Sequence, residues 1–594
     1  MRRLVVAAVC AAILVPAARA ATPTRPVYDS KGHVIETPFA PPKQRPNLSA
    51  FQAKATFLAN PKVHDWLKHY PPKKRQYETT FSSKYRNWTI KIWSGPAGEV
   101  ATGRVDDATN VVTEAWTGPQ VAWKMARGYK GAFGGKEINS LGVWLGFCIA
   151  FLLGLADFRR PLSVRNLDLL ALLSFTVSLW YFNKGHVFTS VPLVYPPLVY
   201  LLGRMLWTAR TGRPPAAGRP LWPVWLLAAV TVFLVGFRVG LNVEDSNVID
   251  VGYSGVVGAE RIAHGQSPYG HFPVEDNLKA CGPADEDGEI RDRVQTNGRC
   301  ESANPRGDTY GPVAYEAYLP AYAVTGWSGK WDTLPAAHAT AVAFDLLCLL
   351  GLALVGLRFG GVPLAATLTF AWAAWPFTQY VSSSNTNDAL LPAFLIWGFW
   401  LVTSSVARGA LVALAGWTKF AALLLVPLWA SYPHAYRGRR PKLVFCGAFL
   451  ATTAAAFFVL LLEPNPLHAA RVFFDRTLGW QVGRDSPFSI WDWRQYHAGL
   501  PDLHVVQIVL ECLLVAGSLA AYFVPRRKSP LQLAALTAAI LIGFELVLTH
   551  WFYLYLPWFF PFVAFAVLTP RTAEAPVEVP AERDRPVREL VPAS

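Results

Sequence analysis

One lysine, Lys419, stands inside an apolar stretch of the sequence, where a charged side chain is costly. The stretch spans Gly409–Ser431 and is interrupted by Gly416-Trp417-Thr418-Lys419. Ionisable groups within membrane-spanning segments usually serve a function, because the cost of burying them must be offset. The alternative is that Lys419 snorkels from an ordinary span to the lipid headgroups. Lys419 is therefore the first candidate for chemistry.

Two carboxylates, Asp245 and Asp250, follow the apolar stretch 221–238 closely. They belong to a polar segment, residues 239–333, that carries 15 acidic and 7 basic residues and thus a net charge of −8. A carboxylate next to a bound hydroxyl can act as a general base. The alternative is that both carboxylates only cap a helix or face water.

The same segment contains Cys281 and Cys300, the only two cysteines that share a polar loop. They are predicted to form a disulfide if the loop faces an oxidising compartment. The acidic run at residues 285–289 lacks the ligand spacing of a calcium loop. No metal or cofactor is therefore predicted, and a bound divalent cation remains the alternative.

The elements that must hold these residues are membrane helices. Of 594 residues, 52% are apolar and 16% are charged, whereas soluble domains carry about 25% charged residues. Long apolar stretches recur between Leu141 and Pro570. The net charge of +15 is typical of basic cytoplasmic loops, so a nucleic-acid partner is not predicted. The chain is expected to be an all-α, multi-pass protein of the plasma membrane, with the lipid bilayer as a partner.

Spans of about 20 apolar residues with basic loops on the inside give eleven crossings. Arg408 and the basic run 437–442 then both lie inside, with only one apolar stretch between them. That stretch is therefore predicted to be a re-entrant hairpin with Lys419 at its tip. Non-helical backbone at membrane depth is tolerated only where it lines a cavity in the protein, so the tip is expected to line one. The predicted spans are 141–156, 167–182, 191–207, 221–238, 335–357, 362–380, 389–406, 443–462, 504–524, 530–549 and 555–569.

Both ends of the chain are predicted to lie outside the folded parts. Residues 1–21 have two arginines, an apolar run and Ala18-Arg19-Ala20, which is typical of a signal peptide. The alternative is an uncleaved signal anchor. Residues 22–47 form a Pro-rich linker, and residues 570–594 a disordered cytoplasmic tail.

Residues 48–138 are predicted to form an extracytoplasmic α+β domain. Two helical patterns, Ser49–Leu58 and one beginning at Asn60-Pro61, precede four strand-like runs. Residues 22–138 carry 18 basic and 9 acidic residues, or +9, so the surface could bind anionic lipid or an acidic polymer, or simply be basic and solvated. The order of the two helices, Asn-Trp-Thr-Ile-Lys-Ile-Trp and the following strands resembles PepSY-like domains.

Residues 221–569 resemble the GT-C superfamily, the polytopic glycosyltransferases that use lipid-phosphate sugars. Residues 139–220 would be three additional transmembrane helices. The resemblance is to the bacterial mannosyl- and arabinosyltransferase-like branch, and it rests on the order of several weak motifs. These are an acidic residue just past a span, Gly265-Gln266-Ser267-Pro268-Tyr269, Tyr310-Gly311-Pro312, Ser384-Asn385-Thr386-Asn387-Asp388, Gly416-Trp417-Thr418-Lys419 and the loop Arg476–Trp493.

The resemblance implies inverting transfer of a sugar from a polyprenyl-phosphate donor to a hydroxyl of an envelope glycan or glycolipid, on the extracytoplasmic face. Asp250 best matches the family's general base, and Asp245 matches the alternative placement. The leaving phosphate needs cations, for which the candidates are Lys419, Arg476, Arg484 and His550. His550 could instead be a belt residue bonded to backbone. Candidates for substrate contacts are Tyr269, Tyr310, Asn385, Asn387 and Asp388.

Two other classes of protein remain possible on the sequence. A transporter or flippase of lipid-linked sugars would favour inverted repeats and charges near the bilayer midplane, and no convincing internal repeat is found. A non-catalytic sensor would leave the long acidic loop and the Asp-Val-Gly-Tyr pattern unexplained.

Overall fold

The computed structural model is mostly helical, with one small sheet near the N-terminus. It describes residues 46–570 apart from 84–85, 95–98, 119–120, 122–132, 185, 214–221, 271, 273–278, 280–291, 295–297, 299, 303–306, 330–333, 437, 483–485 and 494–500. The predicted signal peptide and tail lie outside the described residues. The chain divides into two compact units, one built around the sheet and one containing the helices from residue 141 onward.

The first unit confirms the predicted order of two helices and four strands. Its sheet is an antiparallel meander in the order β1-β2-β3-β4, and both helices pack on the same face. Phe57 of α2 lies against Gly103 of β3, where a Cβ would come within 2.3 Å of the ring. The elements are α2 (Ala50–Leu58), α3 (Pro61–Leu67), η1 (Pro72–Lys74), β1 (Arg75–Ser82), β2 (Asn87–Ser94), β3 (Glu99–Asp106) and β4 (Val112–Thr117).

Local signals in the sequence explain these boundaries. Ser49 and Gln52 form a capping box that starts α2, and Asn60 caps α3 with Pro61 at its first position. The buried carboxylate of Asp107 then fixes the chain entering the unit. It accepts hydrogen bonds from the backbone of Asn47 and from the Trp88 indole, and it pairs with Arg86 at 2.8 Å.

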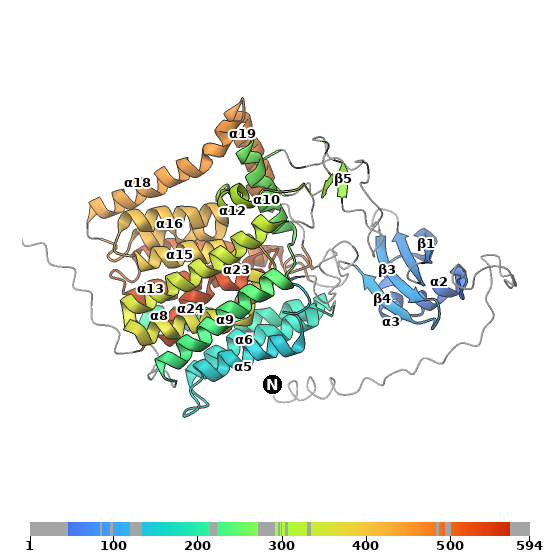
Figure 1. The fold of residues 1–594 in the computed structure, drawn as a ribbon, viewed down its shortest axis with the longest axis horizontal. Coiled ribbons are helices and arrows are strands. Elements are labelled where there is room, and N and C mark those ends of the chain that lie inside the picture. The colour runs from blue at the N-terminus through green and yellow to red at the C-terminus, as the bar shows by residue number, and fades with distance from the viewer. Residues whose placement is uncertain are drawn as a thin grey trace, which may run out of the picture. The chain divides into compact units, whose positions relative to one another are not determined.

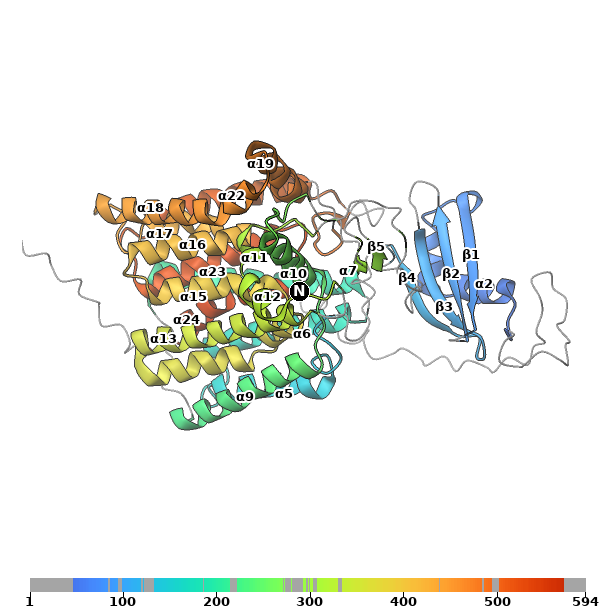
Figure 2. The ribbon, with the colours of Figure 1, turned by 45° about the horizontal axis from the view of Figure 1, so that its top comes forward.

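The second unit is a bundle of helices, many of which run side by side in both views (Figures 1 and 2). Residues 133–139 also belong to it, since Phe133 packs against Tyr380 and Phe552. Its main helices are α5 (Leu141–Leu155), α6 (Val164–Phe182), α8 (Tyr195–Thr211), α9 (Val224–Glu244), α10 (Asp250–Ala263), α13 (Pro335–Ala374), α14 (Pro376–Ser383), α15 (Leu390–Trp400), α16 (Ser405–Thr418), α18 (Arg439–Ala456), α19 (Pro466–Phe474), α22 (His504–Phe523), α23 (Pro530–Val547) and α24 (Phe560–Leu568).

Short elements connect these helices. They are α7 (Val187–Ser190), η4 (Val191–Val194), β5 (Asp292–Val294), β6 (Cys300–Ser302), α11 (Val313–Glu316), α12 (Leu319–Thr325), η5 (Asn387–Ala389), η6 (Phe420–Leu425), α17 (Val426–Ala430), η7 (Phe457–Leu462), η8 (Asp475–Gly479), α20 (Trp480–Val482) and η9 (Tyr553–Trp558).

Five helices in the described residues are long and apolar enough to cross a membrane: α9, α13, Arg439–Leu462, α22 and α23. One of them, α13, supplies two of the predicted spans, because its backbone leaves the helical conformation at Gly361. Gly356 then lies against Ala365, so the two halves pack on each other. These helices are typical of a membrane-embedded protein, while the count of eleven spans stays a prediction.

Buried ion pairs join neighbouring helices of this unit. Arg238 of α9 binds Asp345 of α13 at 2.5 Å, and the Trp372 indole donates to the same carboxylate. Arg204 of α8 likewise binds Asp168 of α6 at 3.1 Å. Asp345, a carboxyl group inside an apolar helix, thus takes part in bonding between neighbouring helices.

The chain turns back at Lys419, as the hairpin prediction requires. Lys419 has extended backbone angles between α16 and η6, and Gly416 of α16 lies against Leu423 of η6. At the other end, the Arg408 guanidinium donates to the carbonyls of Trp429 and Tyr432. The stretch between residues 408 and 432 therefore begins and ends at the same end of the bundle.

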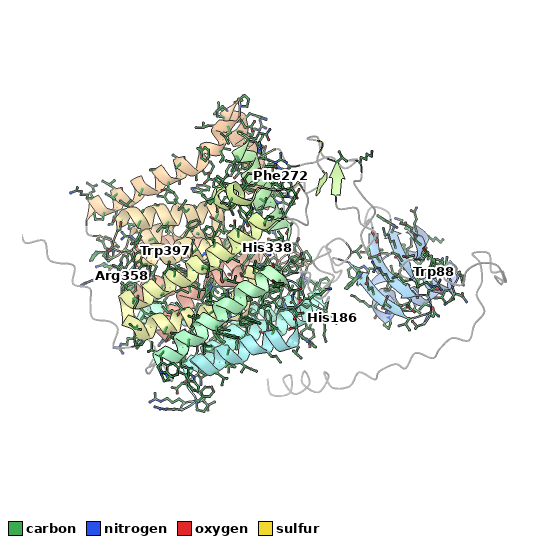
Figure 3. All side chains as sticks on the ribbon, viewed as in Figure 1. Trp88, His186, Phe272, His338, Arg358 and Trp397 are labelled. Carbon is green, nitrogen blue, oxygen red and sulfur yellow. The ribbon has the colours of Figure 1, made fainter. Side chains whose placement is uncertain are left out.

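The bundle has two chemically different ends. At one end, which we call the arginine end, Arg358 bonds to Thr403, Lys528 bonds to the carbonyl of Pro525, and Ala435 bonds to Arg526. At the other, the site end, lie α10, α12 and α19 (Figures 1 and 2). The first half of α13 connects the two, with His338 near the site end and Arg358 near the arginine end (Figure 3).

Candidate functional site

Helix α10, which begins at Asp250, is packed unusually closely at the site end. Its glycines 252, 255 and 258 recur every three residues on one side. A Cβ at Gly252 would lie 2.1 Å from the carbonyl oxygen of Asn385, and one at Gly258 would lie 2.2 Å from the Tyr315 ring. This close approach fixes the start of α10 beside the segment that contains Asn387 and Asp388.

The two candidate bases have different surroundings. Asp245 ends α9, and its Oδ2 accepts the Glu137 backbone N–H at 2.5 Å. Asp250 is the first residue of α10 and is half-buried; its Oδ1 accepts the N–H of Val251 at 3.0 Å. Asp250 is the better placed of the two for a base, because it starts α10 beside the segment that contains Asn387 and Asp388.

Lys419 is paired with a buried carboxylate. Its Nζ lies 3.1 Å from Oδ1 of Asp388, and the two side chains are 9% and 1% exposed. Three aromatic rings surround the ammonium, with centroids at 4.5 Å for Tyr310 and 5.8 Å for Tyr555 and Trp558. An ammonium over such rings gains cation–π stabilisation. Lys419 is thus held inside the protein and does not snorkel.

Polar atoms without hydrogen-bond partners gather next to this ion pair. Among the described residues, Nδ2 and Oδ1 of Asn387 and Nε1 of Trp558 are buried and make no hydrogen bond. The Asp388 carboxylate accepts no well-aligned hydrogen bond either, although Lys419 is close. A buried polar group left unsatisfied costs about 1–3 kcal/mol. These atoms are therefore the natural place for a polar ligand to bind.

A further carboxyl group, Glu545 of α23, belongs to the same region. Its Oε2 accepts the Trp551 indole N–H at 3.0 Å, and its Oε1 is buried without a hydrogen bond to any described residue. It is close enough to Asp388 for their charges to interact. The region therefore combines two buried carboxyl groups with the one ammonium of Lys419.

The segment around Tyr310 covers the tip of the hairpin. A Cβ at Gly311 would lie 2.0 Å from the carbonyl oxygen of Trp417, so the two backbones touch. The Tyr269 hydroxyl donates to the Tyr310 carbonyl at 2.9 Å, and the Tyr310 N–H donates to the Tyr315 hydroxyl. Burial raises the pKa of Tyr269 and of Tyr315 well above the usual range, so both hydroxyls stay protonated.

Arg476 is also paired with a buried carboxylate. Its Nε lies 2.7 Å and its Nη2 2.6 Å from the oxygens of Asp308, which is fully buried and also accepts the Gly270 N–H. The pair ties η8 to the segment that contains Tyr310. Both Lys419 and Arg476 are thus compensated by carboxylates, and neither is an isolated positive charge.

Asn385 has a positioning role. Its φ of 51° lies in the left-handed region, which asparagine tolerates better than most residues. The amide nitrogen donates to Ser246 at 2.8 Å, and the amide oxygen accepts from Asn242 at the same distance. Asn385 therefore fixes the loop that presents Asn387 and Asp388.

The remaining candidates from the sequence are His550, Arg484 and the cysteine pair. His550 shares a hydrogen bond of 2.9 Å with Ser486 and packs against Phe488. Arg484 lies outside the described residues, as do the side chains of Cys281 and Cys300.

Sequence reasoning missed Tyr555, Trp558 and Glu545 as neighbours of Lys419. The run Tyr553–Phe560 is so apolar and aromatic that it is typical of a membrane span. Its tryptophan, Trp558, is then typical of an interfacial aromatic belt. The one available signal was Glu545, a carboxyl group inside an apolar stretch.

In the described residues, no group of three or more His, Cys, Asp or Glu side chains could hold a metal ion. Comparison with known proteins assigns no family: no protein-family model matches the chain, and no curated protein matches it.

Proposed function

We propose that the chain is an integral membrane glycosyltransferase resembling the GT-C superfamily, which transfers a sugar from a polyprenyl-phosphate donor to a hydroxyl acceptor. The observation that carries the proposal is the buried cluster of Asn387, Asp388 and Lys419. A carboxylate, an amide and an ammonium together offer the donors and acceptors that adjacent sugar hydroxyls need. The faces of Tyr310 and Trp558 offer apolar surface for the sugar ring.

The charge balance of the cluster also favours a sugar in this position. Because Asp388 neutralises Lys419, the cluster suits an uncharged, hydroxyl-rich group better than a bare phosphate. An ammonium has three N–H donors, so Lys419 can hold Asp388 and still donate to a ligand. The phosphate would then lie at the edge of the cluster, within reach of a further Lys419 donor.

In the proposed reaction, Asp250 accepts the proton of the acceptor hydroxyl. The hydroxyl oxygen forms a bond to the anomeric carbon while the bond from that carbon to the phosphate oxygen breaks, and the polyprenyl phosphate leaves with the electron pair. Attack from the face opposite the leaving group inverts the anomeric configuration. General-base catalysis of this kind contributes about 10²- to 10⁴-fold to the rate.

The proposal extends to the other parts of the chain. The N-terminal unit would be a PepSY-like domain on the extracytoplasmic side, and the acceptor would be an envelope glycan or glycolipid. No cofactor is required by this chemistry. The site end of the bundle would then face outward and the arginine end would face the cytoplasm, in line with the distribution of basic residues in membrane proteins.

The first test is to incubate the purified protein with a panel of radiolabelled polyprenyl-phosphate sugars and to measure transfer or donor hydrolysis. Asp250→Asn should reduce turnover at least about 100-fold without lowering the yield or the thermal midpoint. Asp245→Asn is the matched control and should retain most activity. Normal turnover by Asp250→Asn would refute the base assignment, and movement of the lipid across the bilayer without transfer would indicate a flippase.

A further inference from the structure

The first unit carries an exposed run of basic residues where the chain crosses from α3 to β1. We call residues Lys68, His69, Lys73 and Lys74 the lysine turn; all four side chains are exposed. The Arg75 guanidinium donates hydrogen bonds to the carbonyls of Leu67 and Tyr70, each at 2.6 Å. These bonds fix the backbone of the turn between α3 and β1.

The lysine turn lies at the end of the sheet from which the chain leaves this unit. Strand β1 starts there and β4 ends there, as the register shows: Arg75 pairs with Ser94, and Ala101 pairs with Thr117. Gly118, the residue after β4, lies against the ring of Trp66, which itself contacts His69. The chain continues from this end to α5, an apolar helix that starts at Leu141.

The opposite end of the same sheet is chemically different. The turn between β3 and β4 carries Asp106 and Asp107. The incoming chain is bound there, through the backbone of Asn47 to Asp107, and the nearby Arg86 is paired with the same carboxylate. The lysine turn and the pair Asp106 and Asp107 therefore lie at opposite ends of the strands, and β4 ends at the lysine turn.

We propose that the lysine turn binds the anionic headgroups of the bilayer in which α5 is anchored. Clusters of lysine close to a membrane-spanning helix are attracted to anionic lipid. The ion pair between Lys68 and Asp65 is exposed on both sides, and such pairs are weak enough to exchange for a lipid phosphate. The inference concerns a surface of the first unit and does not depend on the proposed transferase activity.

Lysine footprinting on the full-length protein tests the proposal. The protein is reconstituted in nanodiscs of phosphatidylcholine alone, or with phosphatidylglycerol added, and its lysines are acylated briefly and quantified by mass spectrometry. Lys68, Lys73 and Lys74 should react several-fold more slowly in the anionic discs. Lys91, on the uncovered face of the sheet in the same unit, is the internal control and should react at the same rate in both. The protection should disappear at about 1 M salt, where the Debye length is about 3 Å.

Variants identify the residues responsible. Lys73→Gln with Lys74→Gln should weaken the protection of Lys68, while Lys91→Gln should leave it unchanged. Equal acylation of the lysine turn in both kinds of disc would overturn the proposal, and so would equal protection of Lys91. Protection by soluble polyphosphate in neutral discs, without protection by anionic lipid, would overturn it in favour of an acidic polymer.

Discussion

At the scale of single residues, Lys419 and Asp388 depend on each other. Removing one partner of a buried ion pair leaves the other charge uncompensated and costs about 3–5 kcal/mol, whereas replacing both by neutral groups costs much less. Lys419→Met should therefore lower the thermal midpoint of the purified protein clearly. The double variant Lys419→Met, Asp388→Asn should recover most of the midpoint.

The same pair of variants separates stability from function. If the cluster binds the sugar, the double variant is folded but inactive, because it lacks both the ammonium and the carboxylate. A double variant no more stable than Lys419→Met would show that the two charges do not compensate each other. A double variant with full transferase activity would remove the cluster from the proposed site.

Glu316, in α11, gives a second prediction at this scale. Burial raises its pKa from the ordinary 4.5 to about 8, so the folded protein keeps it protonated where the unfolded chain has lost the proton. Its contribution to stability is complete below about pH 4.5 and is lost as the pH rises through about 8. Glu316→Gln cannot titrate, so the variant should gain stability over the wild type between pH 5 and pH 9.

The measurement is the difference in thermal midpoint between variant and wild type as a function of pH. Glu244→Gln, at an exposed position at the end of α9, is the matched control for the substitution itself. A flat difference for Glu316→Gln would show that its carboxyl group is not buried from water.

The sequence indicated Lys419 as a candidate functional residue but did not predict its partner. The hairpin was predicted from local information, since basic residues on both sides of one apolar stretch fit a chain that turns back better than a single straight span. The pairing with Asp388 depends on how two distant segments pack, and no periodicity in the sequence reports that. Lys419 and Arg476 were predicted as cations for the leaving phosphate without any partner in the protein, and the structure gives each a buried carboxylate.

At the scale of elements, the position of α10 depends on its glycines. A Cβ at Gly258 would come 2.2 Å from the Tyr315 ring, and Tyr315 in turn holds the backbone of Tyr310 over Lys419. Overpacking of this kind costs about 1–3 kcal/mol. Gly258→Ala should lower both the thermal midpoint and the transfer rate, because it displaces Asp250 and Tyr310 together.

Gly240 of α9 offers a matched control, since a Cβ there would meet nothing within 4 Å. Alanine favours a helix over glycine by up to about 1 kcal/mol, so Gly240→Ala should be neutral or slightly stabilising. Similar midpoints for the two variants would mean that α10 can move away from Tyr315 without loss.

Element boundaries in the first unit were the most predictable part of the fold. The capping residues Ser49 and Asn60 and the alternation of β2 are local signals, and the two helices begin within a residue of the expected positions. The glycine contacts of α10 could not be predicted from the sequence. Gly252, Gly255 and Gly258 by themselves indicate only a weak helix former, and not which distant segment lies against them.

At the scale of the whole molecule, basic residues from several loops gather at one end of the bundle, while the predicted alternation of eleven spans stays a prediction. The basic loops converge at the arginine end, where Ala435 bonds to Arg526 and Lys528 bonds to Pro433. Asn387, Lys419 and α10 gather at the other end. If the chain crossed the bundle in a different order, basic loop residues and site residues would occur together at both ends.

Which end faces outward can be measured with single cysteines and a membrane-impermeant thiol reagent in intact cells. Leu467→Cys, at an exposed position in α19, should react above the background of the native cysteines if the site end faces outward as proposed. Arg440→Cys, exposed at the start of α18, should react only after permeabilisation. Since α18 and η7 lead from Arg440 to α19, equal labelling of both positions in intact cells would contradict a crossing between them. The reverse pattern would place the proposed site in the cytoplasm, where a donor on the extracytoplasmic face could not reach it.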